Sequence, residues 1–242
     1  MWGDNMERNQ LTLLLGVVQP TTMNIKIRPY RTGDADALFE AAHESIADVF
    51  PWLPWCHPGY KISEVRDWIA MQIESFAKGR QYHFVIASEA HKFLGACGLS
   101  QLDSINRSAN LGYWVRTSAA GQGVASTAAR SVVEWAFSST EIERIEIVAA
   151  LKNKQSQTVA EKTGALREGI SRSRLLLHDR FHDAVIYSII KSSWLKGRDD
   201  PLQKSGHILY TSTPVIGPTP NRLSNRFMVQ SGGERSCPRA SG

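Results

Sequence analysis

One stretch of the sequence, Asn110 to Ala136, limits what this chain can fold into more than any other. It begins with a run of high strand propensity, from Leu111 to Arg116. Small residues fill Thr117 to Gly123, and the apolar residues after them recur at helical spacing: Val124, Ala128, Val132 and Trp135. The stretch therefore predicts a strand, a glycine turn and an amphipathic helix in direct succession.

The glycine turn has two interpretations. Gly121 and Gly123 allow the backbone to pass close to a bulky ligand because no Cβ stands in the way. The amides of Gln122 to Val124 would then point out of a helix N-terminus, where unpaired N–H groups and the helix dipole favour an anion such as a diphosphate. In the other interpretation the turn serves packing alone, as it does in many α/β units.

A second unit downstream favours the ligand-binding interpretation. Asn153-Lys-Gln-Ser156 is followed by Ala160-Glu-Lys-Thr-Gly164. Together with the glycine turn, this unit resembles the pyrophosphate loop and the asparagine-containing helix of the GNAT superfamily of acyl-CoA N-acyltransferases. Gly123 and Ala125 match the loop pattern of that family, whereas Ala120 stands where it has Arg or Gln.

The resemblance implies acetyl-CoA as the cofactor and a set of residues that would bind it. Main-chain amides of the Tyr113–Val115 strand would polarise the thioester carbonyl. Asn153 would bond the pantetheine arm, a role that is compatible with capping the helix. The implied cofactor-binding set is Trp114, Val115, Arg116, Gly121, Gln122, Gly123, Val124, Ala125, Asn153 and Ser156.

The strands and helices expected along the chain agree with this family. Strands are expected at Ile25–Pro29, Tyr82–Ala87, Phe93–Leu99, Ile145–Ala149, Ala165–Ser171 and Phe181–Ile190, in addition to Leu111–Arg116. Further helices are expected after a Thr32 cap, after a Ser63 cap and over Gln155–Thr163. The order resembles the GNAT fold, an α/β (α+β) arrangement in which a mixed, mostly antiparallel twisted sheet is flanked by helices and splayed between its fourth and fifth strands.

Domain boundaries follow from composition. We expect residues 1–23 to be an N-terminal extension, residues 24–198 to form the acetyltransferase domain, and residues 199–242 to be a disordered tail rich in Pro, Ser, Gly, Thr and Arg. The apolar run Leu11 to Val18 is too short to span a membrane.

The net charge and the cysteine content indicate which partners and which cellular location to expect. A net charge of +5 in 242 residues is mild, so we expect no nucleic-acid partner. The three cysteines show neither metal spacing nor a disulfide framework, which predicts no metal and a cytoplasmic location. The chain is expected to be a monomer or a homodimer.

Several motifs resemble the RimJ/RimL branch of the family, which acetylates the N-terminal α-amine of ribosomal proteins. They are the Phe50-Pro-Trp-Leu-Pro-Trp55 loop, the Asn-Leu-Gly-Tyr-Trp-Val strand, the Asn-x-x-Ser helix start and the stretch from Lys162 to Gly169. The resemblance implies that Trp52, Trp55 and Tyr113 contact the acceptor.

The catalytic groups are less fully defined by the resemblance. Many family members protonate the leaving thiolate with a Tyr, but that position here is Ala160, and in the RimL-like pattern Ser156 has this role. Ser156 could instead be a helix residue that satisfies a backbone amide. The Glu that serves RimL-like enzymes as base aligns with Leu175, which leaves water, or by location only His83, Glu44 or His57.

Three functions remain open at this point. The first is acetyl-CoA-dependent acetylation of a protein N-terminus. The second is acetylation of a small amine, either a polyamine or an antibiotic, although sites for polycations usually gather carboxylates and the Trp-rich loop offers none. The third is a non-catalytic acyl-CoA-binding regulatory module.

Overall fold

The computed structural model describes residues 24 to 199. The expectations for residues 1–23 and for the tail therefore lie outside the described residues, apart from residue 199. The elements in chain order are β1 (Ile25–Pro29), η1 (Thr32–Asp34), α1 (Ala35–Glu44), α2 (Ile46–Val49), α3 (Ile62–Ala77), β2 (Tyr82–Ser88), β3 (Phe93–Asp103), β4 (Ser108–Val115), η2 (Thr117–Ala119), α4 (Val124–Ser139), β5 (Arg144–Ala150), α5 (Lys154–Thr163), β6 (Leu166–Leu177), β7 (Arg180–Ile190) and α6 (Lys191–Asp199).

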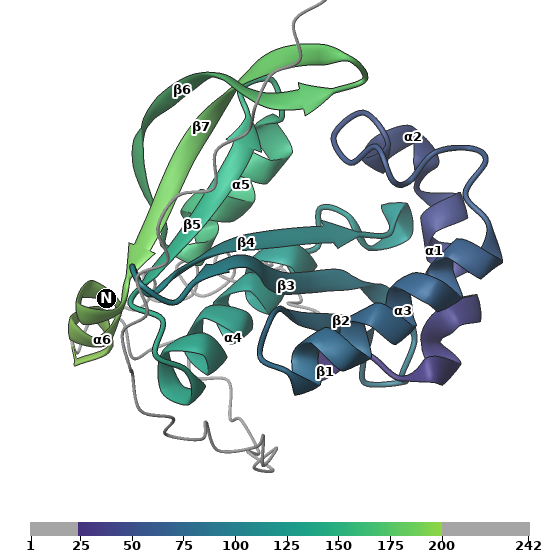
Figure 1. The fold of residues 1–242 in the computed structure, drawn as a ribbon, viewed down its shortest axis with the longest axis horizontal. Helices are drawn as coiled ribbons and strands as arrows, with labels where there is room; N and C mark the ends of the chain where they lie inside the picture. The colour runs from purple at the N-terminus through teal and green to yellow at the C-terminus, as the bar shows by residue number, and fades with distance from the viewer. Residues whose placement is uncertain (1–23, 200–242) are drawn as a thin grey trace, which may run out of the picture. The chain divides into compact units, whose positions relative to one another are not determined.

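The described strands form one seven-stranded sheet in the order β1-β2-β3-β4-β5-β7-β6 (Figure 1). Every neighbouring pair is antiparallel except β4 with β5, which are parallel. This is the mixed, mostly antiparallel sheet that the sequence predicts. A helix must connect two parallel neighbours, and α4 supplies that connection.

Two apolar cores cover the two faces of the sheet. On one face α4 and α5 pack against alternate residues of the central strands, and this core includes Leu111 and Ile147. On the other face α1 and α3 pack against the β1–β3 side of the sheet, and this core includes Val85 and Ala96. Strand side chains alternate between faces, so consecutive residues of β4 belong to different environments.

One glycine lets β3 approach β4 closely. Gly95 has a φ of 154°, and a Cβ at this position would collide with the carbonyl oxygen of Trp114 on the neighbouring strand. A glycine inside a strand often marks such an approach. The tight contact fixes the end of β4, which is the part of the strand that borders the cleft described below.

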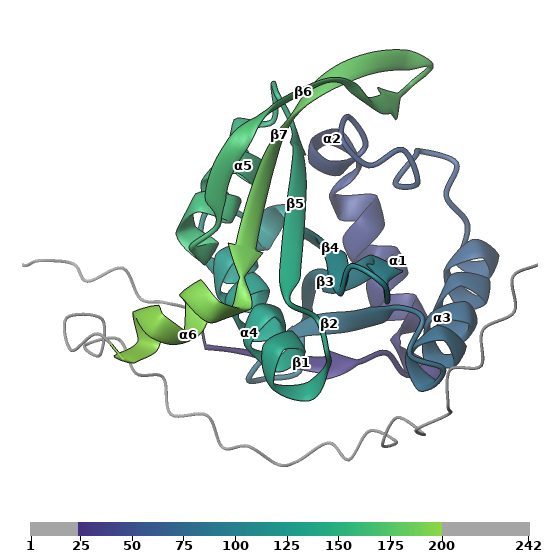
Figure 2. The same ribbon diagram turned by 60° about the vertical axis from the view of Figure 1, so that its left-hand side comes forward.

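The hairpin of β6 and β7 extends beyond the rest of the sheet. Figures 1 and 2 show it curving over toward α2, a segment far away in sequence. At its tip His178 lies against Phe50, with ring centroids 4.4 Å apart and Nε2 3.0 Å from the Phe50 carbonyl oxygen. The tip of the hairpin therefore contacts the end of α2.

The structure corrects several boundaries. Helix α3 begins after Lys61 and not after Ser63, because Glu64 accepts the Lys61 N–H at 2.8 Å. Thr32 lies in the short helix η1 and does not cap α1, which begins at Ala35. Strand β6 is longer than expected, and helix α6 was not predicted. Within the described residues, no helix has both the length and the apolar character needed to cross a membrane.

Candidate active site

A cleft lies where β4 and β5 separate. These two strands pair only over Ser108–Asn110 and Arg144–Glu146. Beyond that point Leu111–Val115 and Ile147–Ala150 form opposite walls of a cleft of about 410 Å³. Pairing of β4 with β3 and of β5 with β7 continues on the outer sides, so the main-chain groups that face the cleft have no strand partner there.

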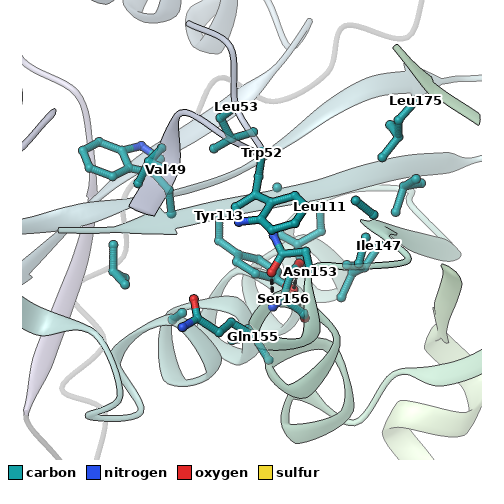
Figure 3. Close-up of a pocket in the computed structure, with 18 of the residues that line it drawn as sticks. Val49, Trp52, Leu53, Leu111, Tyr113, Ile147, Asn153, Gln155, Ser156 and Leu175 are labelled. Carbon is teal, nitrogen blue, oxygen red and sulfur yellow. Dashed lines mark hydrogen bonds between the residues drawn. The ribbon is translucent and has the colours of Figure 1, made fainter. Parts of the chain in front are cut away.

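Asn153, Ser156 and Tyr113 form a hydrogen-bonded group on the α5 side of the cleft (Figure 3). Asn153 caps α5, and its Oδ1 accepts the Ser156 N–H at 3.0 Å. The Tyr113 hydroxyl donates to the Ser156 carbonyl oxygen at 2.8 Å and lies 3.2 Å from Ser156 Oγ. The Ser156 hydroxyl therefore does not serve a backbone amide, which was the structural alternative for this residue.

The Tyr113 hydroxyl is held in its neutral form. Burial raises the pKa of this phenol, and it outweighs the opposing effect of the hydrogen bond from Ser156. Because the single phenolic proton goes to the Ser156 carbonyl oxygen, the Ser156 hydroxyl keeps its own proton for the Tyr113 oxygen or for a group in the cleft.

The glycine turn leads into α4 as the sequence predicts. Gly121 and Gly123 have φ values of 74° and 77°, so both adopt the left-handed conformation that favours glycine. Hydrogen bonds among the described residues use the N–H groups of Ala119, Ala120 and Thr127, and none is found for the N–H groups between Gly121 and Ser126. Free N–H groups at a helix N-terminus fit an anionic group such as a diphosphate.

An ion-pair network anchors the start of this turn to α1. Arg116 is only 4% exposed, and its guanidinium bonds Glu44 and Glu40, the latter at 2.8 Å. The other Glu44 oxygen accepts the Ser118 N–H at 2.8 Å. Hydrogen bonds from Arg116, followed by the one from Ser118, lower the pKa of Glu44 to about 2. Glu44 thus holds the turn in place as a permanent anion.

The opposite side of the cleft is mostly apolar. Val49, Trp52 and Leu53 reach it from α2 and the loop that follows, and Leu175 and Leu177 reach it from β6. In Figure 3, Leu53 and Leu175 lie on one side of the strands and Gln155 and Ser156 on the other. The cleft therefore passes through the sheet and opens toward both faces.

Most of the predicted site residues lie together in the cleft. Its lining includes Trp52, Tyr113, Trp114, Val115, Ala125, Asn153 and Ser156. Gly121, Gln122, Gly123 and Val124 form the turn next to it, where Gln122 Nε2 donates to the Ser118 carbonyl oxygen at 2.9 Å and Val124 is buried.

The structure does not bring Trp55 and Arg116 to the cleft. Trp55 packs against Tyr60 and Trp114 in the core on the α1 side, because the turn after Pro54 directs it inward. Arg116 is committed to Glu40 and Glu44. Spacing in the sequence could not distinguish a guanidinium paired with α1 from one that faces a cofactor.

None of the three substitute bases lines the cleft. Glu44 is the anion that binds Arg116. His83 packs against Trp68, and burial lowers its pKa to about 4. His57 lies 3.9 Å from Glu64 on the outside of the loop. By contrast, Leu175 does line the cleft, and so the position where RimL-like enzymes have a Glu offers no carboxylate here.

Sequence reasoning did not assign several polar residues of the lining, and Asp48 and Asn110 are two of them. Asp48 accepts a hydrogen bond from Thr117 Oγ1 at 2.6 Å. Asp48 lies four residues after Glu44, so a continuous helix would have placed both carboxylates on one face. The helix is interrupted at Ser45, and the sequence did not predict this. Asn110 opens the strand motif and was considered only as part of that motif.

Comparison with known proteins agrees with this site. A family model described as an acetyltransferase (GNAT) domain matches residues 24–166. The chain belongs to the GNAT acetyltransferase family. Members of this family transfer an acetyl group from acetyl-CoA, so the chain is an acetyl-CoA-dependent N-acetyltransferase.

Individual relatives support the same assignment. The chain is 31% identical over 181 residues to a putative ribosomal N-acetyltransferase, YdaF, of Bacillus subtilis (strain 168), with 71% of this chain and 93% of the relative covered. It is 29% identical to a probable acetyltransferase of known crystal structure, with a TM-score of 0.66 and coverage of 70% and 94%.

A third comparison concerns the fold alone. The structure of the RimL ribosomal-protein α-N-acetyltransferase in complex with coenzyme A is 22% identical and has a TM-score of 0.65, with 70% of this chain and 95% of that chain covered. The GNAT fold of this chain is therefore shared with an enzyme crystallised with coenzyme A.

Glu44→Gln should reduce the loss of stability that acid causes. The folded-state pKa of Glu44 is about 2 against an ordinary 4.5. Its contribution to the free energy of unfolding is therefore complete above about pH 4.5 and is lost as the pH falls toward about 2. Urea titrations of both proteins at about pH 6 and about pH 3 measure this difference. Arg116→Met should remove the same pH dependence, and an unchanged dependence in both variants would contradict the anchoring role.

Proposed function

We propose that the chain transfers the acetyl group of acetyl-CoA to the N-terminal α-amine of a protein, a ribosomal protein being the first candidate. The observation that carries this proposal is the composition of the acceptor side of the cleft, where Trp52 and aliphatic side chains predominate and where the lining of the cleft has one carboxylate, Asp48, alongside the cation Arg174. A polyamine needs several carboxylates to balance its charges, whereas a protein N-terminus brings a single amine and a main chain. A ribosomal acceptor would also place the reaction in the cytoplasm.

Direct transfer suits such an acceptor. A free α-amine has a pKa of about 7.7 to 8.0, so a sizeable fraction is already neutral near neutral pH. A strong protein base is therefore not required, and water can accept the proton that the amine loses. This agrees with Leu175 at the position where RimL-like enzymes carry a Glu.

Different residues of the chain would bind different parts of the cofactor. The N–H groups of Gly121 to Val124 would hold the diphosphate, and Asn153 would contact the pantetheine arm. Main-chain groups of Tyr113 to Val115 would orient the thioester, which supplies the activated acetyl group. Ser156 Oγ would donate its proton to the departing sulfur, and Tyr113 could then donate to the Ser156 oxygen in its place.

An acceptor panel tests the proposed function. Thiol release from acetyl-CoA should be faster with peptides that carry the N-terminal sequences of ribosomal proteins than with spermidine or spermine. A matched peptide with a blocked α-amine and a free Lys side chain should be a poor acceptor, and mass spectrometry locates the acetyl group. Faster turnover of a polyamine would overturn the proposal and favour the small-amine alternative.

Gly123→Asp should weaken acetyl-CoA binding at least tenfold, because it places a like charge beside the diphosphate. Gly123→Asn is the matched control, since Asn has nearly the same shape and also tolerates a positive φ. Calorimetry should show a much smaller loss for Asn than for Asp. Equal affinities for the two folded variants would show that no phosphate lies at this turn.

Ser156→Ala should lower kcat by about tenfold to 10²-fold, toward the low end of general acid catalysis because a thiolate is a good leaving group. The KM for acetyl-CoA should change little. Ser156→Thr keeps a hydroxyl and should retain most of the activity. A Ser156→Ala enzyme with the wild-type kcat would mean that the thiolate takes its proton from solvent.

A further inference from the structure

The side chain of Asn110 has an unsatisfied hydrogen-bond acceptor in the cleft. Its Oδ1 is buried and has no hydrogen-bond partner among the described residues. Three other buried side-chain atoms share this condition, on Tyr30, Gln72 and Trp194, but Asn110 is the one of the four that lines the cleft. A buried acceptor without a partner is costly, and such a group calls for an explanation.

Asn110 marks the point at which the two strands part. Its pair with Glu146 is the last of the β4–β5 ladder. The next residue, Leu111, packs into the core beside α4, and so does Tyr113. Because strand side chains alternate, Asn110 and Gly112 face the other side of the sheet, the side on which Trp114 joins the α1 core.

The surroundings of Asn110 fit an acceptor rather than the cofactor. Ser156 bonds Tyr113, which belongs to the α4 side. Asn110 is thus on the opposite side of the strand from the proposed proton donor. Gly112, its neighbour on that side, leaves open space, since a Cβ there would meet no atom within 4 Å.

The amide oxygen of Asn110 is suited to bind an amine. An amide oxygen accepts a hydrogen bond but carries no charge and takes no proton. Both the ammonium and the neutral amine offer it an N–H, whereas a carboxylate would favour the ammonium, which cannot attack the thioester. A neutral acceptor can therefore hold an amine through loss of its proton without opposing that loss.

We propose that Asn110 Oδ1 accepts an N–H of the acceptor amine and positions its nitrogen at the vertex of the cleft. This inference rests on the transfer of acetyl groups to amines and not on the acceptor being a protein. It assigns a substrate-positioning residue that no carboxylate in the cleft replaces, because Asp48 is bonded to Thr117.

The decisive variant is Asn110→Leu, which is close in shape and lacks the acceptor atom. The kcat/KM for the amine should fall at least tenfold, while the Kd for acetyl-CoA stays within about twofold of wild type. The Tm of the free protein should stay the same or rise, because the substitution removes an unsatisfied buried group. Asn106→Leu, which makes the same change in the exposed turn before β4, is the matched control and should keep wild-type kinetics.

Asn110→Asp tests the role of neutrality. It retains an acceptor oxygen but adds a negative charge that stabilises the ammonium, so the rise of activity with pH should move to higher pH than in wild type. This variant also keeps the inference testable if Asn110→Leu does not fold. A pH–rate profile identical to wild type in Asn110→Asp would count against contact between residue 110 and the amine.

Two results for Asn110→Leu would contradict the proposed role of Asn110. Wild-type amine kinetics in Asn110→Leu would overturn the inference, and so would a joint loss of Tm and acetyl-CoA affinity, which would indicate a structural role. The assay uses whichever amine the wild-type enzyme acetylates fastest. If peptides fail and a small amine succeeds, the proposed function falls, while the effect of Asn110→Leu on that small amine still decides the inference.

Discussion

The early separation of β4 from β5 is the constraint on which the rest of the site depends. Three residue pairs hold the two strands together, and then each continues with its outer neighbour alone. A sheet interior normally pairs its backbone groups with one another. Here the main-chain groups of β4 and β5 that face the cleft have no strand partner and are available to a ligand. The two strands themselves are held in place because β4 pairs with β3 and β5 pairs with β7.

A second requirement is that the glycine turn before α4 begins at a fixed place. Arg116 meets it by burying a guanidinium between the turn and α1, where Glu44 and Glu40 neutralise it. A buried charge is tolerated only when it is paired in this way. Because the ion pair fixes the start of the turn, the glycines after it can leave their N–H groups free for an anion.

Side chains of β4 point alternately to the two faces of the sheet, so the two sides of the cleft carry different chemical groups. Odd-numbered residues from Leu111 to Val115 face α4 and α5, where Tyr113 meets Ser156 and Asn153. Even-numbered residues face the other side of the sheet, where α2 and β6 line the cleft with Val49, Leu175 and Leu177 and with the charged Asp48 and Arg174. The proposed proton donor and the proposed amine-binding residue thus lie on opposite sides of one strand and do not compete for the same atoms.

The sequence alone determined the local features of this protein. The glycine turn, the Asn153 cap and the order of strands and helices all follow from short-range rules of propensity, capping and periodicity, and the family pattern rests on the same residues. Contacts between distant segments were decided only by the tertiary structure. Arg116 meets α1 across some seventy positions of sequence, Trp55 turns into a core, and the Oδ1 of Asn110 has no hydrogen-bond partner among the described residues. The spacing of residues along a chain does not predict such long-range contacts. These contacts depend on how far two strands stay paired and on which helix packs beside them.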